Sequence, residues 1–392
     1  IVPLAATILV LGIGLIIHLP LSKIAKKSTE DAELRHALLI DSITGLETIK
    51  LSGAAGRFQG LWNRIAAATA KRASKSRLFS NFAINITITA SQVAGIIIVV
   101  LGVIMISKGE LTAGTLIAVV ILNGRAVGSL GQVASLLVRL NQAWSAYQSL
   151  NQIMQLPTER PIEKNFINRS KVKGRIEFKN VTFCYPGRTV PVLRDVSFSI
   201  PQGSSVGLIG RIGSGKTTIL RLILNLYKPD KGSILIDGID SRQIDPVDLR
   251  KNIGASLQDA YFFNGSIREN LVLGQMGTND EHIEWAMKLT NLDKFVASHP
   301  HGLDLMIGER GEALSNGQRQ ALVLTRTFLR DPPILLLDEP TSMMDSPTET
   351  HIQKTIRETF PDRTLILVTH RASLIESVNH LLVIDEGKIA AQ

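Results

Sequence analysis

Three long apolar stretches set the strongest limit on what this chain can fold into. They cover residues 3–21, 83–106 and 111–137, and a helix needs about 20 apolar residues to cross a bilayer. Core helices of a large soluble protein are the alternative interpretation. Three such runs in a chain of 392 residues, 45% apolar and with a mean hydropathy of +0.17, make it the weaker one. We therefore expect an α-helical transmembrane domain with three spans.

The basic residues lie where a cytoplasmic loop is expected. Ser22 to Ser80 holds eleven Lys or Arg against five Asp or Glu, which is the charge bias of cytoplasmic membrane loops. With this loop inside, the SKGEL connection lies outside and the chain beyond the third span is cytoplasmic. The formal charge of +9 then needs no nucleic-acid partner. The single cysteine, Cys184, excludes an internal disulfide and fits the reducing cytosol.

The third apolar stretch contains Asn123 and Arg125. Such groups are costly against lipid, so they are expected to face a protein interior or a water-filled cavity. Arg125 is therefore a candidate for a transport pathway. The alternative is that it lies in the hydrated end of the helix and has no specific role.

Beyond the spans, the chain has three segments with different residue patterns. Residues 138–156 keep an apolar pattern at helical spacing up to Pro157. With them, residues 1–156 form the expected partial membrane domain, and the polar segment 157–174 is a predicted linker. From 175 to 392, short β-rich runs alternate with helical ones, which predicts an α/β domain with a largely parallel sheet. The expected strands are IEFKNVTFCY, VLRDVSFSI, SVGLIG, SILIDG, ILLLDEP and TLILVTH.

A glycine-rich segment, GRIGSGKTT, follows the predicted strand SVGLI and precedes a predicted helix. In this setting backbone N–H groups close around a β-phosphate at the helix N-terminus. Lys216 is expected to reach the β- and γ-phosphate oxygens, and Thr217 to bind Mg²⁺. The other nucleotide-binding residues expected in this loop are Gly210, Gly213, Ser214, Gly215 and Thr218.

Two carboxylates, Asp338 and Glu339, end the apolar run ILLLDEP, and a buried strand tolerates them only near a cation. We expect Asp338 in the Mg²⁺ shell through water. Glu339 is expected to orient the attacking water, a role worth about 10²–10⁴-fold in rate. The alternative for Glu339 is a cap on the next helix. His370 ends the run TLILVTH and is expected to donate to the γ-phosphate, whereas a lone histidine would be interpreted as structural.

These motifs together resemble those of ABC-transporter ATPase domains. GRIGSGKTT, ASLQDAYFF, LSNGQRQ, ILLLDEP, SMMD and the final TH occur in the order found in that family. The resemblance implies an α/β P-loop NTPase domain of ABC type with a helical subdomain, with ATP and Mg²⁺ as its ligands. It implies that Gln258 acts in catalysis and in the Mg²⁺ shell, that Asp345 contacts nucleotide and that Tyr185 stacks on adenine.

LSNGQRQ corresponds to the family signature LSGGQ and lies far downstream of the phosphate loop. In the family, two ATPase domains pair head to tail, and each signature covers the ATP bound to its partner's phosphate loop. The resemblance implies that Ser315, Gly317 and Gln318 contact nucleotide in this way. Asn316 occupies a glycine position. We expect that position to need unusual φ and ψ angles, which Asn tolerates best among non-glycine residues.

Several segments look most like the type I secretion ATPase/permease group of ABC exporters, which moves unfolded adhesins and toxins. They are GLETIKLSGAAGRFQGLW, RQIDPVDLRKNIG, FNGSIRENLVLG and HPHGLDLMIGERG. Such exporters have six membrane helices per subunit. The three expected here would be the fourth to sixth, so we expect a fragment that begins within a membrane helix at Ile1 and lacks any N-terminal peptidase-like domain. The implied partners are a second subunit, in a homodimer, a membrane fusion protein, an outer-membrane channel and a polypeptide cargo.

The sequence therefore predicts an ATP-hydrolysing exporter subunit of the cytoplasmic (inner) membrane, with its ATPase domain in the cytoplasm. ATP binding would close the dimer and hydrolysis would open it, and the loop near Gly53–Phe58 would pass the change to the membrane helices. Export of lipid or drug is the alternative within this class. A non-hydrolytic ATP-gated module is opposed by Glu339 and His370, because binding alone needs no water-orienting carboxylate. Soluble ABC ATPases acting on DNA or ribosomes are opposed by the membrane spans.

Overall fold

The computed structural model describes residues 32–161, 163–275 and 277–392. The chain divides into two compact units, Ile1–Leu156 and Pro157–Gln392. The first predicted span, 3–21, lies outside the described residues. In the part of the chain that is described, no helix has both the length and the apolar character of a membrane span.

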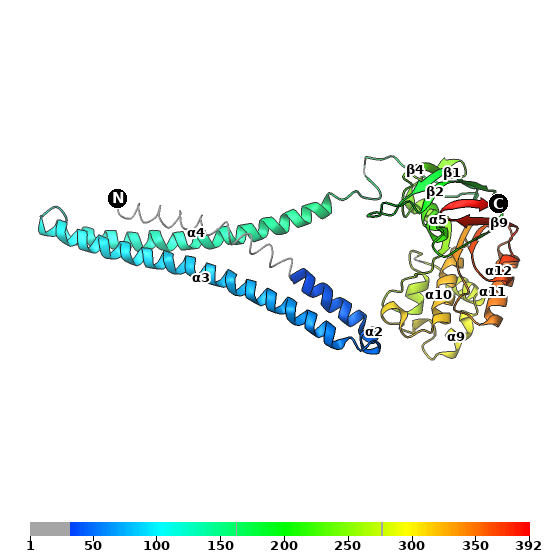
Figure 1. Cartoon of the computed structure of the whole chain (residues 1–392), viewed down its shortest axis with the longest axis horizontal. Helices are drawn as coiled ribbons and strands as arrows, with labels where there is room; N and C mark the ends of the chain where they lie inside the picture. The colour runs from blue at the N-terminus through cyan, green and yellow to red at the C-terminus, as the bar shows by residue number, and fades with distance from the viewer. Residues whose placement is uncertain (1–31, 162, 276) are drawn as a thin grey trace. The chain divides into compact units, whose positions relative to one another are not determined.

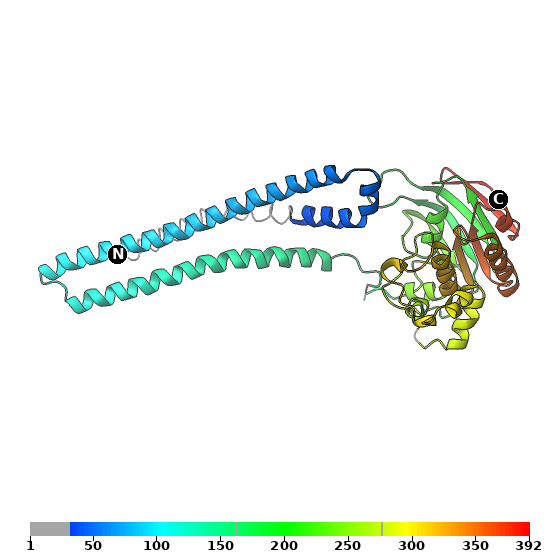
Figure 2. The same ribbon diagram turned by 90° about the horizontal axis from the view of Figure 1, so that it is seen from below.

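The first unit is helical. Residues 32–44 form a helix, which the short helix α2 (Leu46–Leu51) follows. After a turn, the long helix α3 (Ala55–Ser107) begins, and α4 (Ala113–Met154) runs back along it (Figures 1 and 2). The apolar run 83–106 lies within α3. The run 111–137 begins in the connection between α3 and α4 and continues into α4. The segment predicted to continue the third span is part of the same unbroken α4.

Two local features build the α3–α4 hairpin. The Thr112 hydroxyl accepts a hydrogen bond from the Thr115 N–H at 3.3 Å, which caps the start of α4. Farther along α3, a Cβ added to Gly102 would lie 2.3 Å from Leu116 Cδ1. Glycine at this position therefore lets the two helices approach closely.

The second unit contains two β-sheets (Figure 1). A six-stranded sheet has the order β10-β9-β3-β8-β7-β6 and is parallel except for the β9–β10 pair. A four-stranded sheet has the order β2-β1-β4-β5 and is antiparallel. The strands of the first are β3 (Ser205–Gly210), β6 (Ile253–Ser256), β7 (Ile334–Asp338), β8 (Thr364–Val368), β9 (His380–Asp385) and β10 (Lys388–Ala391). Those of the second are β1 (Ile176–Phe183), β2 (Leu193–Ile200), β4 (Lys231–Ile236) and β5 (Ile239–Asp240).

The residue patterns explain why the strands separate into two sheets. Every residue of β7 and β8 is buried, as expected for parallel strands covered on both faces. In β2 buried and exposed residues largely alternate, the pattern of a strand with one face in water. One largely parallel sheet was expected for all of the β-rich runs. That expectation is wrong for β1, β2 and β4, which form the separate antiparallel sheet.

A helical subdomain lies between β6 and β7 in the chain. It consists of α7 (Ile267–Leu271), α8 (Asp280–Lys288), α9 (Leu292–Ser298) and α10 (Asn316–Phe328), with short 3₁₀ turns at Gly302–Asp304 and Glu309–Gly311. The remaining helices are α5 (Lys216–Ile223), α6 (Pro246–Lys251), α11 (Ser346–Thr359) and α12 (Ala372–Ile375). One apolar cluster joins α5 to both sheets, and a second joins the subdomain and α11 to β7 and β8. The predicted α/β domain with a helical subdomain is thus confirmed.

Candidate active site

The phosphate loop joins β3 to α5 through positions where only glycine fits. Gly215 has φ +108°, and a Cβ there would lie 2.7 Å from Leu193 Cδ2. A Cβ on Gly210 would lie 2.0 Å from the Ile384 carbonyl oxygen. The Ser214 side chain is 4% exposed, and its hydroxyl makes no hydrogen bond within the described chain. The loop is therefore closely packed, ends at a helix N-terminus and retains an unused buried hydroxyl, as a phosphate site would.

Lys216 begins α5 and is buried. Its Nζ donates to the carbonyl oxygens of Gly210, at 2.7 Å, and Arg211, at 2.9 Å, so the side chain folds back across the loop. Burial lowers the pKa of the Lys216 ammonium, and the carboxylates of Asp338 and Glu339 oppose this shift. One cation and two carboxylates from different elements therefore act on each other at this loop.

The next residue, Thr217, makes a direct link to β7. Its Oγ1 donates to Asp338 Oδ2 at 2.7 Å. Burial raises the pKa of the Asp338 carboxyl, and the bond from Thr217 opposes the rise. A hydroxyl and a buried carboxylate are oxygen donors of the kind that Mg²⁺ takes together with phosphate and water. The pair therefore fits the predicted Mg²⁺ site, where a cation would compensate the buried charge.

A cavity of about 600 Å³ opens beside the phosphate loop. Tyr185 lines it, and its hydroxyl lies 3.1 Å from Thr218 Oγ1 and accepts a bond from Arg221 at 3.3 Å. The Tyr185 ring also packs edge-on against Tyr227, with 5.1 Å between centroids. These contacts hold Tyr185 beside the loop, where an adenine contact would require it, and the stacking itself stays a prediction. The cavity is lined by Tyr185, Arg188, Val192, Gly213, Gly215, Lys216, Thr217, Thr218, Arg221, Tyr227 and Gln258.

Glu339 and His370 follow the ends of the neighbouring parallel strands β7 and β8. Glu339 Oε1 lies 3.7 Å from His370 Nε2, and both side chains are partly exposed. Glu339 also has φ +47°, a conformation that costs a non-glycine residue on the order of 1–3 kcal/mol and often occurs at functional sites. The cap of α11 is Asp345 rather than Glu339. The structure thus brings Glu339 and His370 together and does not support the helix-capping alternative.

Gln258 lines both cavities of the site. It lines the phosphate-loop cavity with Lys216 and Thr217, and a second cavity of about 600 Å³ with Asp338 and Glu339. This placement agrees with the predicted role of Gln258 beside Mg²⁺, and the coordination itself stays a prediction. The second cavity extends from there to the N-terminus of α10.

The signature segment forms the start of α10. The Ser315 hydroxyl accepts from the Gln318 N–H at 3.2 Å, and Gln318 Oε1 accepts from the Ser315 N–H at 2.8 Å, which is a capping box. Asn316 is the first helical residue, and its side chain accepts from Arg319. The expectation of unusual φ and ψ at Asn316 is therefore wrong, because the position is an ordinary helix start. Ser315, Gly317 and Gln318 do not line the phosphate-loop cavity of this chain, as far as it is described.

Asp345 serves a local structural purpose. Its side chain accepts from the Thr348 N–H at 3.3 Å and caps α11. Hydrogen bonds from Thr348 hold the pKa of Asp345 below its usual range. Neither cavity of the site includes Asp345 among its described lining residues. Its predicted contact with nucleotide stays a prediction.

Two residues that the sequence reasoning did not single out contact the loop after Glu339. Gln320, in LSNGQRQ, bonds to the backbone of Glu339, and Arg371, which follows His370, bonds to the backbone of Ser342. Each stands beside a recognised motif residue, which is the only indication that the sequence offers. Residue type alone does not show that these side chains reach a loop from another element.

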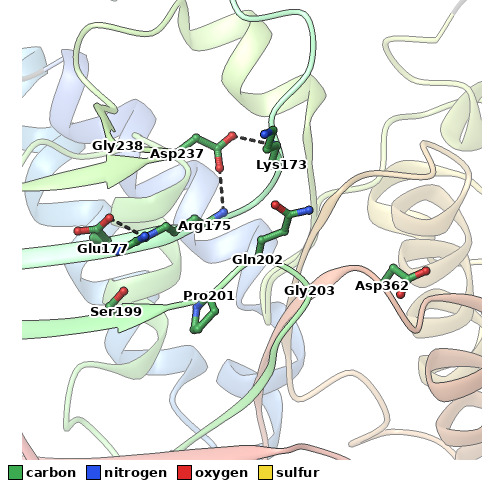
Figure 3. Close-up of a pocket in the computed structure, with 10 residues that line it drawn as sticks. All are labelled: Lys173, Arg175, Glu177, Ser199, Pro201, Gln202, Gly203, Asp237, Gly238 and Asp362. Carbon is green, nitrogen blue, oxygen red and sulfur yellow. Dashed lines mark hydrogen bonds and ion pairs between the residues drawn. The ribbon is translucent and has the colours of Figure 1, made fainter.

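A larger cavity, of about 990 Å³, lies at the other end of the strands (Figure 3). Gly203 borders it and precedes β3, whereas the phosphate loop follows β3. Asp237 accepts the N–H groups of Lys173 and Arg175, and Arg175 pairs with Glu177 at 2.8 Å. These charged groups bind neighbouring segments of the chain, and the described lining contains none of the predicted site residues. The cavities around Lys216 and Glu339 are therefore the candidate active site.

Models of known protein families match parts of both units. The ABC transporter model matches residues 193–342, and the ABC transporter transmembrane region model matches residues 1–129. Together the two matches cover more than half of the chain. The first includes the phosphate loop, the signature and the Asp338–Glu339 pair.

Individual proteins are similar over almost the whole chain. The leukotoxin translocation ATP-binding protein LktB of Mannheimia haemolytica is 32% identical over 391 residues, which are 95% of this chain and 53% of that protein. The protein of the same name from Bibersteinia trehalosi shows the same values. The chain thus spans about half the length of these curated relatives.

A solved structure shows the same fold. The structure of a bacterial Atm1-family ABC exporter with ATP bound matches 99% of this chain and 68% of that one, with a TM-score of 0.91 and 29% identity. The family matches, the relatives and this structure agree on one family. The chain belongs to the ABC transporter family and joins an ABC transporter transmembrane region to an ABC-type ATPase domain.

Proposed function

We propose that this chain is part of an ATP-hydrolysing exporter subunit that drives an unfolded protein outward across the cytoplasmic membrane by type I secretion. One observation carries the hydrolytic part. Lys216, the Thr217–Asp338 pair and the Glu339–His370 pair meet at the ends of β3, β7 and β8. The cargo is supported by the similarity to LktB, which is named for leukotoxin translocation.

The geometry suggests how each side chain acts on ATP. Lys216 exchanges its bonds to loop carbonyls for bonds to phosphate oxygens, which explains a buried ammonium folded over the loop. Mg²⁺, which Thr217 and Gln258 would bind and Asp338 would reach through water, would neutralise phosphate charge. Glu339 orients the attacking water and polarises it as a base, and His370 donates a hydrogen bond to the γ-phosphate oxygens.

The signature supports a second copy as the partner. Ser315 and Gly317 are at the N-terminus of α10, outside the cavity that holds Lys216 in the described chain. In a head-to-tail homodimer the same surface is used twice, so two composite ATP sites form and close together. ATP would then favour the closed pair, and hydrolysis would release it. A membrane fusion protein and an outer-membrane channel complete the proposed export route.

Replacement of Glu339 by Gln tests the proposed chemistry. The amide keeps the size of the side chain but cannot act as a base, so we expect ATP turnover to fall by about 10²-fold or more. ATP binding should be unchanged, and the closed dimer should accumulate. Phosphate release and nucleotide binding are measured on the purified transporter. Glu358→Gln, at an exposed position near the end of α11, is the matched control, and wild-type phosphate release from the Glu339 variant would contradict the assignment.

The cargo has one alternative. The match to an Atm1-family ABC exporter at 29% identity does not select a cargo, so export of a lipid or drug is the alternative to be tested. ATPase activity of the reconstituted transporter is measured with an unfolded polypeptide that carries a C-terminal secretion signal, and separately with lipids. Our proposal expects stimulation by the polypeptide. Stimulation by lipid alone would select the alternative and leave the ATPase assignment intact.

A further inference from the structure

The loop that follows the catalytic carboxylate is held by one side chain from the signature helix. Gln320 lies on α10, one turn beyond the capping box. Its Nε2 donates to the Glu339 carbonyl oxygen at 2.7 Å and to Ser342 Oγ at 3.2 Å. Its Oε1 accepts from the Met343 N–H at 2.8 Å. One amide group therefore uses both of its ends on the loop from Glu339 to Met343.

The backbone at Glu339 needs such a restraint. Its φ of +47° is unfavourable for a non-glycine residue and persists only where the surroundings enforce it. On one side, the Glu339 N–H donates to the Val368 carbonyl oxygen at 2.8 Å, which ties it to β8. On the other side, the Glu339 carbonyl is bonded to Gln320. These two bonds set the direction in which the Glu339 side chain leaves the backbone.

A second restraint reaches the same loop from the segment after His370. Arg371 Nη2 donates to the Ser342 carbonyl oxygen at 3.2 Å. The Arg371 guanidinium is itself paired with the buried carboxylate of Glu349 on α11. Ser373 Oγ donates to the other Glu349 oxygen at 2.6 Å. Arg371 therefore connects the same loop to α11, whereas Gln320 connects it to α10.

We propose that Gln320 is a positioning residue, which holds the backbone of Glu339 so that its carboxylate faces the reacting phosphate, and which makes that position depend on α10. Gln320 does not touch the reacting atoms itself. This inference rests on the proposed hydrolytic function. Since the signature residues cap the same helix, ATP bound against the N-terminus of α10 and the carboxylate of Glu339 are linked through a single amide.

Three substitutions in the whole transporter separate the hydrogen bonds of Gln320 from the volume of its side chain. Gln320→Ala removes the amide and the volume, and Gln320→Met keeps the length but removes both bonds. Gln320→Glu keeps an acceptor for the Met343 N–H but cannot donate to the Glu339 carbonyl when ionised. We expect kcat to fall on the order of 10²-fold in all three, because small misplacements at a catalytic group have effects of this size. The KM and Kd for ATP should stay within about twofold of the parent, a change worth only about 0.4 kcal/mol.

The control is the same substitution at the other end of the strands. Gln202→Ala changes a residue that lies beside the cavity of Figure 3, before β3, and should leave kcat unchanged. Thermal unfolding is measured on every variant. A fall in kcat that follows the fall in melting temperature across the variants would make Gln320 merely structural and would overturn the inference.

A double substitution tests whether Gln320 acts through Glu339. In the Glu339→Gln background the carboxylate is already lost, so Gln320→Ala should lower the residual turnover little further, whereas independent effects would add. Full additivity would overturn the inference. A parent protein that hydrolyses no ATP would instead contradict the proposed function. A parent that hydrolyses ATP while Gln320→Met retains full kcat would contradict only the role of Gln320.

Discussion

At the scale of single residues, the burial of the Asp338 carboxylate lowers the stability of the protein and favours the binding of a cation. It is buried at the end of β7, and burial raises the pKa of its carboxyl. The folded protein therefore binds a proton at Asp338 more tightly than the unfolded chain does. The free energy of unfolding falls as the pH rises from the usual pKa of an aspartate through the raised pKa, because Asp338 then ionises in the folded protein. A group kept charged at such a cost is typical of a cation site.

Asp338→Asn should therefore stabilise the protein when neither nucleotide nor Mg²⁺ is present. Asn is neutral and its oxygen can still accept from Thr217, so we expect the melting temperature at pH 7 to rise by about 2–4 °C. The gain should shrink at acid pH, where Asp338 is protonated in the parent. Mg²⁺-dependent ATP hydrolysis should be lost. Calorimetry at several pH values measures this, with the exposed Asp331→Asn as control, and a less stable Asn variant at pH 7 would contradict the interpretation.

The signature predicts opposite outcomes for two neighbouring positions. Asn316 is an ordinary first residue of α10 whose side chain bonds only to Arg319 in the described contacts, so Asn316→Gly should change hydrolysis less than about threefold. Gly317→Asp should abolish dimer-dependent hydrolysis, because it places a carboxylate where the partner's phosphates are expected. ATP binding to the variant's own phosphate loop should remain.

The steric effect at Gly317 needs its own control. An added Cβ would lie 3.2 Å from the Met343 carbonyl oxygen, so Gly317→Ala measures the contribution of crowding alone. Hydrolysis is followed on the whole transporter and nucleotide binding on residues 157–392. Loss of ATP binding by that single unit carrying Gly317→Asp would mean that the signature serves its own nucleotide, and the head-to-tail proposal would fail.

At the scale of elements, the cap of α11 connects stability with the loop that carries Glu339. Asp345 caps this helix through the Thr348 N–H, and caps of this kind are lost when the side chain is truncated. Asp345→Ala should lower the melting temperature by about 2–5 °C, whereas Asp345→Asn should not, because Asn caps equally well. Thermal unfolding of both variants tests this. Equal destabilisation by Asn and Ala would show that the charge, and not the cap, is what matters.

The same pair of variants examines the predicted nucleotide contact. If Asp345 only caps α11, Asp345→Asn should hydrolyse ATP at the rate of the parent. A lower kcat at an unchanged melting temperature would support the contact that the family resemblance implies. The lowered pKa of Asp345 adds a pH dependence: the stability contributed by its ionised form is complete above the usual pKa of an aspartate and is lost as the pH falls through the lowered pKa.

Some elements could be predicted from the sequence and others could not. The buried strands β7 and β8 follow from unbroken apolar runs, and the strand–loop–helix around Lys216 follows from the order of its residues. The division into two sheets could not be predicted, because β1 pairs with both β2 and β4 across intervening segments. A local pattern shows that a strand exists and how it is buried, but not which strand lies beside it.

At the scale of the whole molecule, the second unit should fold and bind ATP by itself. Both of its apolar clusters and every described residue of the phosphate-loop cavity lie within residues 157–392. ATP with Mg²⁺ at about 100 times its Kd should stabilise this unit by about 2.7 kcal/mol. Chelation of Mg²⁺ should reduce the shift, since Thr217 and Asp338 would then lack their cation. A unit that unfolds without residues 1–156 would contradict this expectation.

The sequence by itself determined the class of the molecule and indicated the candidate residues of its chemistry. Apolar length, charge bias, the phosphate loop and the carboxylates that end β7 are local properties, and each can be recognised in a short segment. Only the tertiary structure decided what surrounds those residues. Glu339 lies 3.7 Å from His370 because β7 and β8 pair in parallel, and Gln320 reaches its carbonyl because α10 packs beside that strand end. Such contacts join segments that are far apart in the chain, so no local pattern records them, and the position of the proposed catalytic carboxylate depends on them.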